Sequence, residues 1–257
     1  MILDRIVEST QKRVATLKQT IPLQALKDQA KISDHPFAFE KALSNDGIAF
    51  ICEVKKASPS KGVIAEDFPY VNIAREYEAA GANAISVLTE PEFFQGSNDY
   101  LTEIKKNVHI PLLRKDFIID EIQIYEASLI GADAILLICS ILTDDQVKRY
   151  LQIADALGLS VLVEAHDEEE IQRALNAGGR MIGVNNRNLK NFEVDINNSI
   201  RLRKLVPPEI LFISESGIKT ADDIIKLQEN GTNAVLIGET LMKSGDKKKE
   251  LNKLKSM

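Results

Sequence analysis

Eight short apolar segments follow one another along the chain, and this alternation limits the possible folds more than any other feature. The segments are 49–54, 84–88, 110–113, 134–138, 161–163, 181–184, 210–213 and 234–237. Each has the length of a strand, and amphipathic stretches such as 120–130, with apolar residues at helical spacing, lie between them. Strands that alternate with helices favour a parallel sheet whose buried strands are continuously apolar, as these are. Eight such units predict an α/β fold, the (β/α)8 TIM barrel.

Signals for helix ends fall where this alternation requires them. Pairs with capping-box-like spacing precede several amphipathic stretches: Asp120 with Gln123, Thr143 with Gln146, Asp167 with Glu170, and Thr220 with Asp223. Glycines stand where helices must stop before the next strand, at Gly81, Gly131, Gly178 and Gly231. These glycines recur at about every second strand, which is consistent with a repeated pair of strand–helix units.

The first predicted strand begins only at Ala49, so residues 1–48 are an addition to a barrel whose usual length is about 250 residues. Apolar residues at helical spacing predict an amphipathic helix near the start and a second, short helix over 37–43. No linker signals a second domain. We therefore expect 1–257 to be a single barrel domain, with 1–48 as a helical extension over the barrel mouth.

Composition and charge argue against several classes of function. A chain of 257 residues with 44% hydrophobic content can build a large core. Its net charge of -6 and pI near 5.3 disfavour nucleic acid and anionic membranes as partners. No segment reaches the roughly 18 apolar residues of a membrane span, and the start lacks a signal-peptide core, so we expect a cytoplasmic protein. Cys52 and Cys139 have no metal-ligand or disulfide spacing, and Cys52 should be a small buried hydrophobe.

Ionisable residues stand at the carboxyl ends of four predicted strands. Glu53 and Lys55 share one side of the first strand, and Lys115, Glu164 and Glu215 end the third, fifth and seventh. Catalytic groups of TIM barrels come from this end, and alternate strands contribute to a common interior layer. Any single one of these residues could instead be a solvated surface charge or a member of a structural ion pair, without a catalytic role. Because burial of an unpaired charge is costly, the repetition predicts one reactive site.

Groups suited to anion binding follow the remaining strand ends. They are Asn185 and Arg187 after the sixth strand, Ser216 and Gly217 after the seventh, and Gly238 and Glu239 after the eighth. The Arg187 guanidinium suits a carboxylate or a phosphate. The loops after the last two strands are where barrels often bind phosphate through backbone N–H groups. We therefore expect a phosphorylated ligand.

Longer motifs surround these residues. They are EVKKASPS at 53–60, LRKDF at 113–117, VE at 163–164, GVNNRNL at 183–189, SESGI at 214–218 and ILDRIV at 2–7. Together they resemble the indole-3-glycerol phosphate synthase family of tryptophan biosynthesis over almost the whole chain. The resemblance implies a ring closure in which 1-(2-carboxyphenylamino)-1-deoxyribulose 5-phosphate loses carbon dioxide and water, with no cofactor and no metal.

The resemblance also implies catalytic roles. Lys115 would be the general acid that protonates the substrate carbonyl oxygen, and Glu164 would help to remove protons during dehydration. Glu53 would orient these groups. Lys55 would engage the substrate carboxylate, and whether it also shares the acid role in the later step stays open. Glu215 would support the constellation.

Binding roles follow from the same resemblance. Asn185 and Arg187 would hold polar groups of the substrate, and Ser216, Gly217, Gly238 and Glu239 would surround its phosphate. Pro59, Phe94 and Phe117 are candidates for the apolar slot of the aromatic ring, and Ser58 and Leu189 are the further substrate-binding candidates. Some family members have serine at the position of Glu239, so we expect its backbone N–H rather than its carboxylate to contact phosphate. The amino-terminal helix would close over this mouth and exclude water.

Two other functions stay open. A phosphoribosylanthranilate isomerase-type enzyme would need a cysteine and an aspartate as its acid/base pair, whereas both cysteines lie inside predicted strands. A non-enzymatic phosphometabolite-binding barrel would leave Lys115 and Glu164 without a role. His166 is expected to be an exposed loop histidine beside the Asp167 cap. The expected partner is a small phosphorylated aromatic substrate, not nucleic acid or a membrane, and we expect a monomer that works with other tryptophan-pathway enzymes.

Overall fold

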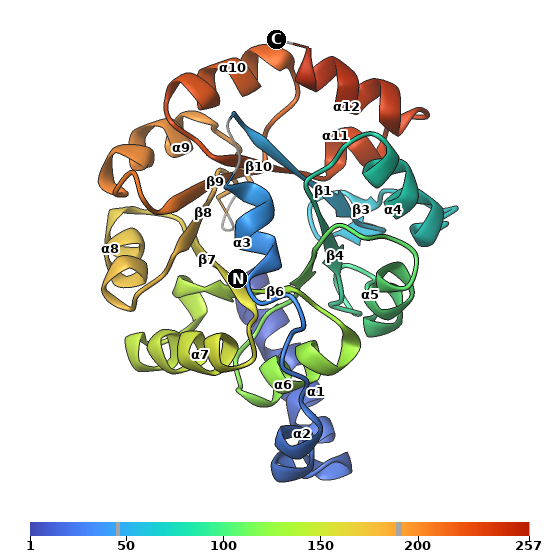
Figure 1. The fold of residues 1–257 in the computed structure, drawn as a ribbon, viewed down its shortest axis with the longest axis vertical. Helices are drawn as coiled ribbons and strands as arrows, with labels where there is room; N and C mark the ends of the chain where they lie inside the picture. Colours follow the sequence, from blue (N-terminus) through green and yellow to red (C-terminus); the bar gives the residue numbers. More distant parts are fainter. Residues whose placement is uncertain (45–46, 189–191, 257) are drawn as a thin grey trace.

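The computed structural model describes residues 1–44, 47–188 and 192–256. Within these residues, eight parallel strands close into a barrel in the order β1-β10-β9-β8-β7-β6-β5-β4 (Figure 1). The strands are β1 (Ala49–Val54), β4 (Ala84–Leu88), β5 (Leu112–Lys115), β6 (Ala134–Ile138), β7 (Ser160–Ala165), β8 (Met181–Asn185), β9 (Leu211–Glu215) and β10 (Ala234–Ile237). The predicted TIM barrel is therefore confirmed.

Helices connect successive strands on the outside of the barrel. They are α4 (Tyr70–Ala79), α5 (Asn98–Lys105), α6 (Ile122–Ile130), α7 (Asp144–Ala156), α8 (Glu168–Asn176), α9 (Asn197–Leu202) and α10 (Ala221–Glu229), and α11 (Glu239–Met242) and α12 (Lys247–Lys255) follow β10. A small hairpin of β2 (Ala57–Ser58) and β3 (Gly62–Val63) follows β1, and short 3-10 turns lie at η1 (Cys139–Ile141) and η2 (Arg203–Leu205). None of the described helices is both long and apolar enough to cross a membrane.

Most predicted boundaries agree with the structure, and the exceptions have local causes. The third strand begins at Leu112 instead of Ile110, because Pro111 has no N–H to donate to the ladder, and it continues to Lys115, which pairs with Leu88. Capping boxes form at Thr143 and Thr220 as predicted. Near Asp120 the pattern shifts, since α6 begins at Ile122 and Gln123 accepts hydrogen bonds from the backbone N–H groups of Ile119 and Asp120.

The core has two layers. Alternate strand residues, such as Ile51, Leu113 and Leu162, fill the barrel interior, while residues of opposite parity, such as Cys52, pack against the surrounding helices. Cys52 is fully buried in this outer layer, as its strand parity predicts. Cys139 is also buried, but it begins η1 just after β6 and does not lie inside the strand.

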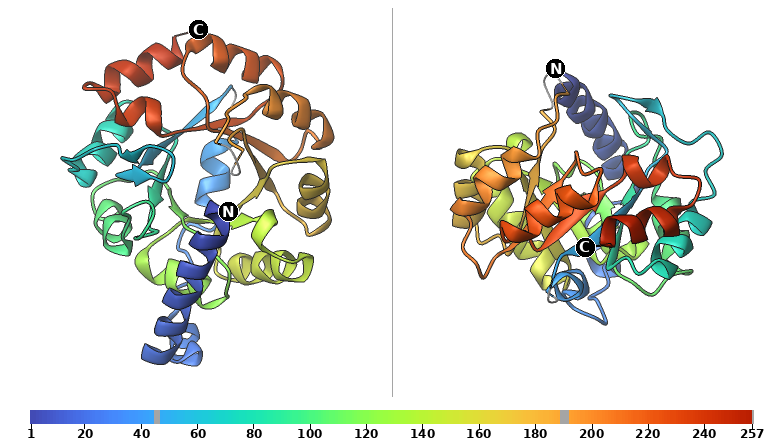
Figure 2. Two further views of the ribbon diagram at one scale, coloured as in Figure 1. Left: turned by 180° about the vertical axis from the view of Figure 1, so that it is seen from behind. Right: turned by 90° about the horizontal axis from the view of Figure 1, so that it is seen from above.

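The segment before β1 contacts both ends of the barrel. It forms α1 (Ile2–Thr20), α2 (Leu23–Gln29), which the sequence reading missed, and α3 (Ala38–Leu43). Phe39 and Leu43 of α3 pack into the interior core beside the first residues of the strands, so α3 closes the amino-terminal end. Figure 1 looks onto α3 in the middle of the ring, and Figure 2 (left) shows α1 on the opposite face, with the amino terminus over the centre.

Candidate active site

A cavity of about 490 Å³ opens at the carboxyl ends of the strands. Of the residues predicted for the site, all those that the structure describes line it: Glu53, Lys55, Ser58, Pro59, Phe94, Lys115, Phe117, Glu164, Asn185, Arg187, Glu215, Ser216, Gly217, Gly238 and Glu239. Leu189 lies outside the described residues. Ile2, Leu3 and Ile6 of α1 line the same cavity from above. Side chains from the ends of β1, β5, β7, β8 and β9 therefore meet in one place, as the strand parity requires.

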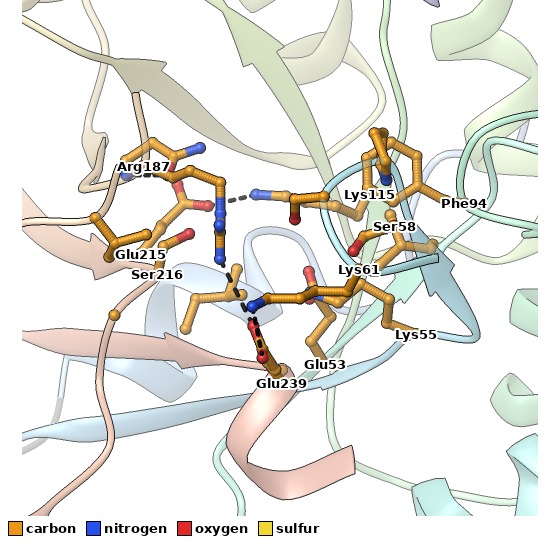
Figure 3. Close-up of a pocket in the computed structure, with 18 of the residues that line it drawn as sticks. Glu53, Lys55, Ser58, Lys61, Phe94, Lys115, Arg187, Glu215, Ser216 and Glu239 are labelled. Atoms are coloured by element: carbon orange, nitrogen blue, oxygen red, sulfur yellow. Dashed lines mark hydrogen bonds and ion pairs between the residues drawn. The ribbon is translucent and has the colours of Figure 1, made fainter. Parts of the chain in front are cut away.

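Lys115 is the centre of a buried charge network (Figure 3). Its Nζ donates a hydrogen bond to Oε2 of Glu215 and lies 3.5 Å from Oε2 of Glu164. Glu164 also accepts a hydrogen bond of 3.3 Å from the Asn185 amide. The side chains of Lys115, Glu164 and Glu215 are 13%, 4% and 3% exposed, so water screens these charges weakly.

The network sets the protonation states of its members. Burial disfavours the Lys115 ammonium, but the carboxylates of Glu215, Glu164 and Glu53 outweigh burial and raise its pKa. Burial also opposes ionisation of Glu164, yet Lys115 and His166 lower its pKa to about 2. Glu215 differs, because burial and the neighbouring Glu164 outweigh Lys115 and raise its pKa to about 7. The site thus holds a charged lysine, an ionised Glu164 and a Glu215 whose pKa lies near neutrality.

Two glycines leave space for these carboxylates. A Cβ on Gly183, in the middle of β8, would lie 2.3 Å from Oε1 of Glu215. A Cβ on Gly238 would lie 2.3 Å from Oε2 of Glu53 and 2.9 Å from Nζ of Lys55, two atoms that form an ion pair. Gly238 therefore accommodates the catalytic candidates of β1 as well as adjoining the predicted phosphate site. Gly183 was missed, although a glycine inside an apolar strand is a signal of close approach.

The loop after β9 has an unusual backbone. Ser216 has φ 68° and Gly217 has φ 86°, so the chain turns through the left-handed region directly at the cavity. The buried Asn186 side chain donates hydrogen bonds of 3.0 Å to the Ser216 carbonyl and to the Ser214 hydroxyl. A left-handed non-glycine residue costs on the order of 1–3 kcal/mol and needs such support. Asn186 was not predicted as a site residue, although it lies within the motif 183–189.

Aromatic rings form the apolar side of the cavity. The ring centroids of Phe94 and Phe117 are 5.9 Å apart. The loop that carries Phe94 is fixed by the fully buried Glu90 carboxylate, which accepts backbone hydrogen bonds from Glu92, Phe93 and Phe94 at 2.7–3.1 Å. Sequence reasoning missed Glu90, because nothing local distinguishes it from an exposed acidic residue.

His166 is not the exposed loop histidine that the sequence predicted. Its side chain is 20% exposed, with Nε2 3.3 Å from Oε1 of Glu164 and Nδ1 2.9 Å from Oε2 of Glu170. Burial opposes the charged form, but the two carboxylates outweigh burial and raise the pKa of His166 to about 10. The cap at Asp167 forms as predicted, through the Glu170 N–H, and the Glu170 carboxylate accepts a hydrogen bond from the backbone N–H of His166.

Neither cysteine is among the described residues that line the cavity, and burial raises the pKa of both thiols to about 12. This disfavours the cysteine/aspartate acid–base pair of an isomerase. In the described ranges, no cluster of three or more histidine, cysteine, aspartate or glutamate side chains is arranged to hold a metal ion. The side chains around the cavity offer the chemistry of lysines, an arginine, carboxylates and the Asn185 amide.

Comparisons with known proteins identify the family of the chain. The family model described as indole-3-glycerol phosphate synthase matches residues 3–254. Proteins of that name from Ruminiclostridium cellulolyticum and Lachnoclostridium phytofermentans are 62% and 54% identical, with 99% and 100% of both chains covered. A solved 3-hexulose-6-phosphate synthase from Salmonella typhimurium has a TM-score of 0.66 over 80% of this chain and 96% of that one; its 15% identity supports the fold alone. The chain belongs to the indole-3-glycerol phosphate synthase family.

Proposed function

We propose that this cavity is where the enzyme converts 1-(2-carboxyphenylamino)-1-deoxyribulose 5-phosphate to indole-3-glycerol phosphate, carbon dioxide and water. The observation that carries the proposal is the meeting of Lys115 with Glu164 and Glu215 between two other features of the cavity. One is the aromatic pair of Phe94 and Phe117, which suits the carboxyphenyl ring. The other is the cluster of Lys61, Arg187 and Lys243, whose positive charges suit the phosphate.

Lys115 is proposed as the acid of the first step. The substrate carbon that carries the carboxylate attacks the carbonyl carbon, and the carbonyl electrons move to oxygen, which takes a proton from the Lys115 ammonium. The neighbouring carboxylates keep Lys115 charged, so it can donate a hydrogen bond to the carbonyl before attack. An alkoxide is far more basic than an amine, so a raised lysine pKa does not prevent the transfer. Loss of carbon dioxide then returns an electron pair to the ring.

Glu164 is proposed as the base of the dehydration. The hydroxyl formed in the first step leaves as water with a proton from an acid, while a base removes a proton to complete the indole. Glu164 has a lowered pKa and is ionised. The Asn185 amide and His166 contact its Oε1, whereas Lys115 faces its Oε2. Lys55 forms an ion pair with Glu53 at the carboxyl end of β1. We propose that Lys55 contacts the substrate carboxylate and shares the acid role in the later step.

Three further assignments belong to the proposal. We assign α1 as a cover that shields the reaction from water, because Ile2, Leu3 and Ile6 line the cavity. We also propose a cytoplasmic monomer that works beside other enzymes of tryptophan biosynthesis. In support of a monomer, the large apolar side chains that are exposed in the described part of the chain are few. Sedimentation of the purified enzyme would test this state.

One assay tests substrate and mechanism together. Purified enzyme is incubated with the carboxyphenylamino sugar phosphate, and indole fluorescence is followed for the wild type and for Lys115→Ala. The wild type should form product, and the variant should lose about 100-fold to 10,000-fold in rate. Absence of product from a folded wild type that still binds the substrate would support a phosphometabolite-binding barrel instead. Equal rates for both proteins would refute the assignment of Lys115.

A further inference from the structure

The carboxylate of Glu239 lies among three cations that come from separate parts of the chain. Its Oε1 is 2.6 Å from Nζ of Lys243 and 3.8 Å from Nζ of Lys61, and its Oε2 is 3.7 Å from Nη2 of Arg187. Lys61 lies in the turn of the β2–β3 hairpin, Arg187 follows β8, Glu239 begins α11, and Lys243 directly follows that helix. All four residues line the cavity, and Figure 3 shows Lys61 and Arg187 both directed at Glu239.

We propose that Glu239 is an internal counter-ion, which occupies the place of the substrate phosphate in the free enzyme. When a phosphorylated ligand binds, its phosphate replaces the Glu239 carboxylate as the partner of these cations. The proposal deepens the function above and rests on it, because it assigns this end of the cavity to the phosphate. Glu239 thereby sets how tightly the enzyme holds phosphorylated ligands. It is a specificity-determining residue that opposes anion binding by its charge.

The ion pairs of Glu239 are suited to exchange. The side chains of Lys243, Lys61 and Glu239 are 55%, 46% and 31% exposed, and exposed ion pairs are individually weak. Arg187 is the most shielded of the three cations, at 21% exposed, and it presents a planar fork of N–H donors that matches a phosphate. No single contact holds Glu239 in place strongly enough to exclude a ligand with greater charge.

A phosphate monoester is such a ligand. It carries a charge of about -1.5 to -2 near pH 7 and three acceptor oxygens, against one charge and two oxygens for the carboxylate. The exchange still has a cost, because Glu239 remains nearby as an ionised group. Burial raises the pKa of Glu239, but Lys243, Lys61 and Arg187 outweigh burial and lower it. Without the carboxylate, the same cations would repel one another until an anion bound.

The backbone around Glu239 is held in place independently of the Glu239 side chain. The left-handed turn at Ser216 and Gly217 lies at the same end of the cavity, and the Thr240 hydroxyl, next to Glu239, donates a hydrogen bond of 2.8 Å to the Ile218 carbonyl. This bond ties the start of α11 to the loop after β9. The Glu239 side chain can therefore change partners while its backbone keeps its position.

The test compares Glu239→Gln with a matched control, Glu250→Gln. Both variants remove one negative charge; Glu250 lies on α12, pairs with Lys253 at 3.6 Å and is outside the cavity. The probe is inorganic phosphate, with its dissociation constant measured by isothermal titration calorimetry at pH 7.5 and low salt. The Michaelis constant for the carboxyphenylamino sugar phosphate is measured beside it, and circular dichroism verifies folding.

In Glu239→Gln, the dissociation constant of phosphate and the Michaelis constant should both fall about 3-fold to 10-fold. This change corresponds to the removal of one or two weak ion pairs that compete with the ligand for the cations. In Glu250→Gln both constants should stay within about twofold of the wild type. Unchanged or weaker phosphate binding in folded Glu239→Gln would overturn the proposal. If the glutamine variant does not fold, Glu239→Ser is tested to the same criterion. The calorimetry does not depend on turnover. An inactive wild type would therefore refute the proposed function, while the phosphate titration would still test the role of Glu239.

Discussion

Replacing Gly183 with alanine should reduce activity by displacing Glu215, with only a moderate loss of stability. The new Cβ would lie 2.3 Å from Oε1 of Glu215 and 3.0 Å from Cδ1 of Leu162. Ordinary contact requires about 3.4 Å, so the carboxylate must move by about 1 Å. Glu215 cannot move freely, because its side chain is 3% exposed and Oε2 is bonded to Lys115.

Both effects have an expected size. A displacement of about 1 Å in a catalytic constellation can cost about 100-fold in rate, or about 2.7 kcal/mol of transition-state stabilisation. Overpacking of a buried site typically costs about 1–3 kcal/mol of unfolding free energy. The variant should therefore remain folded at 25 °C, with kcat/KM for indole formation lowered about 100-fold. Steady-state fluorescence assays and urea unfolding measure the two quantities.

A double-mutant cycle separates displacement from general damage. Glu215→Ala removes the atoms that the new Cβ would meet, so Gly183→Ala should destabilise the Glu215→Ala background less than it destabilises the wild type. Gly179→Ala is the matched control, since its Cβ would contact the Ala174 carbonyl at 3.0 Å outside the cavity, and it should spare kcat/KM. Wild-type activity of Gly183→Ala, or an equal cost in both backgrounds, would refute the reasoning.

Three further predictions concern residues around the site. Arg13→Gln should destabilise the protein by about 1–3 kcal/mol and speed proteolysis of α1, because Arg13 anchors α1 to the buried Asp116 at 2.8 Å. His166→Gln should reduce the pH dependence of the free energy of unfolding. Because the fold raises its pKa to about 10, His166 stabilises the protein fully below about pH 6.5 and loses this contribution as the pH rises to 10. Urea unfolding at several pH values would measure the difference. Glu90→Ala should raise the Michaelis constant several-fold by freeing the Phe94 loop.

Each of these predictions has a control and an outcome against it. Lys12→Gln removes an exposed ion pair on α1 and should leave the free energy of unfolding close to that of the wild type; an equally small change in Arg13→Gln would contradict its role as an anchor. The histidine control is His109→Gln, which changes an exposed residue outside the cavity. An unaltered profile in His166→Gln would show that the imidazole is not held by its two carboxylates. A wild-type Michaelis constant in Glu90→Ala would mean that the Phe94 loop does not bind the substrate.

The sequence determined the architecture because strand and helix signals are local. Apolar segments of strand length, capping residues at fixed spacing and glycines at helix ends depend on neighbours a few positions away. Side-chain alternation then placed Glu53 and Lys55 on one side of β1, and parallel strands brought Lys115, Glu164 and Glu215 to the same end of the barrel. Pattern and topology together were enough to gather the site.

Which of these charges form pairs, and which groups lie next to them, depends on the tertiary structure. His166 looked exposed from its place beside a helix cap, yet the path of the chain from β7 into α8 turns its side chain toward Glu164, two residues earlier, and Glu170, four residues later. The partners of Glu239 include groups 52 and 178 positions away, at Arg187 and Lys61, and no local pattern encodes such contacts. The need for glycine at 183 likewise depends on Glu215 across the strand pair. Ionisation and close packing depend on distances between remote residues, which the fold alone fixes.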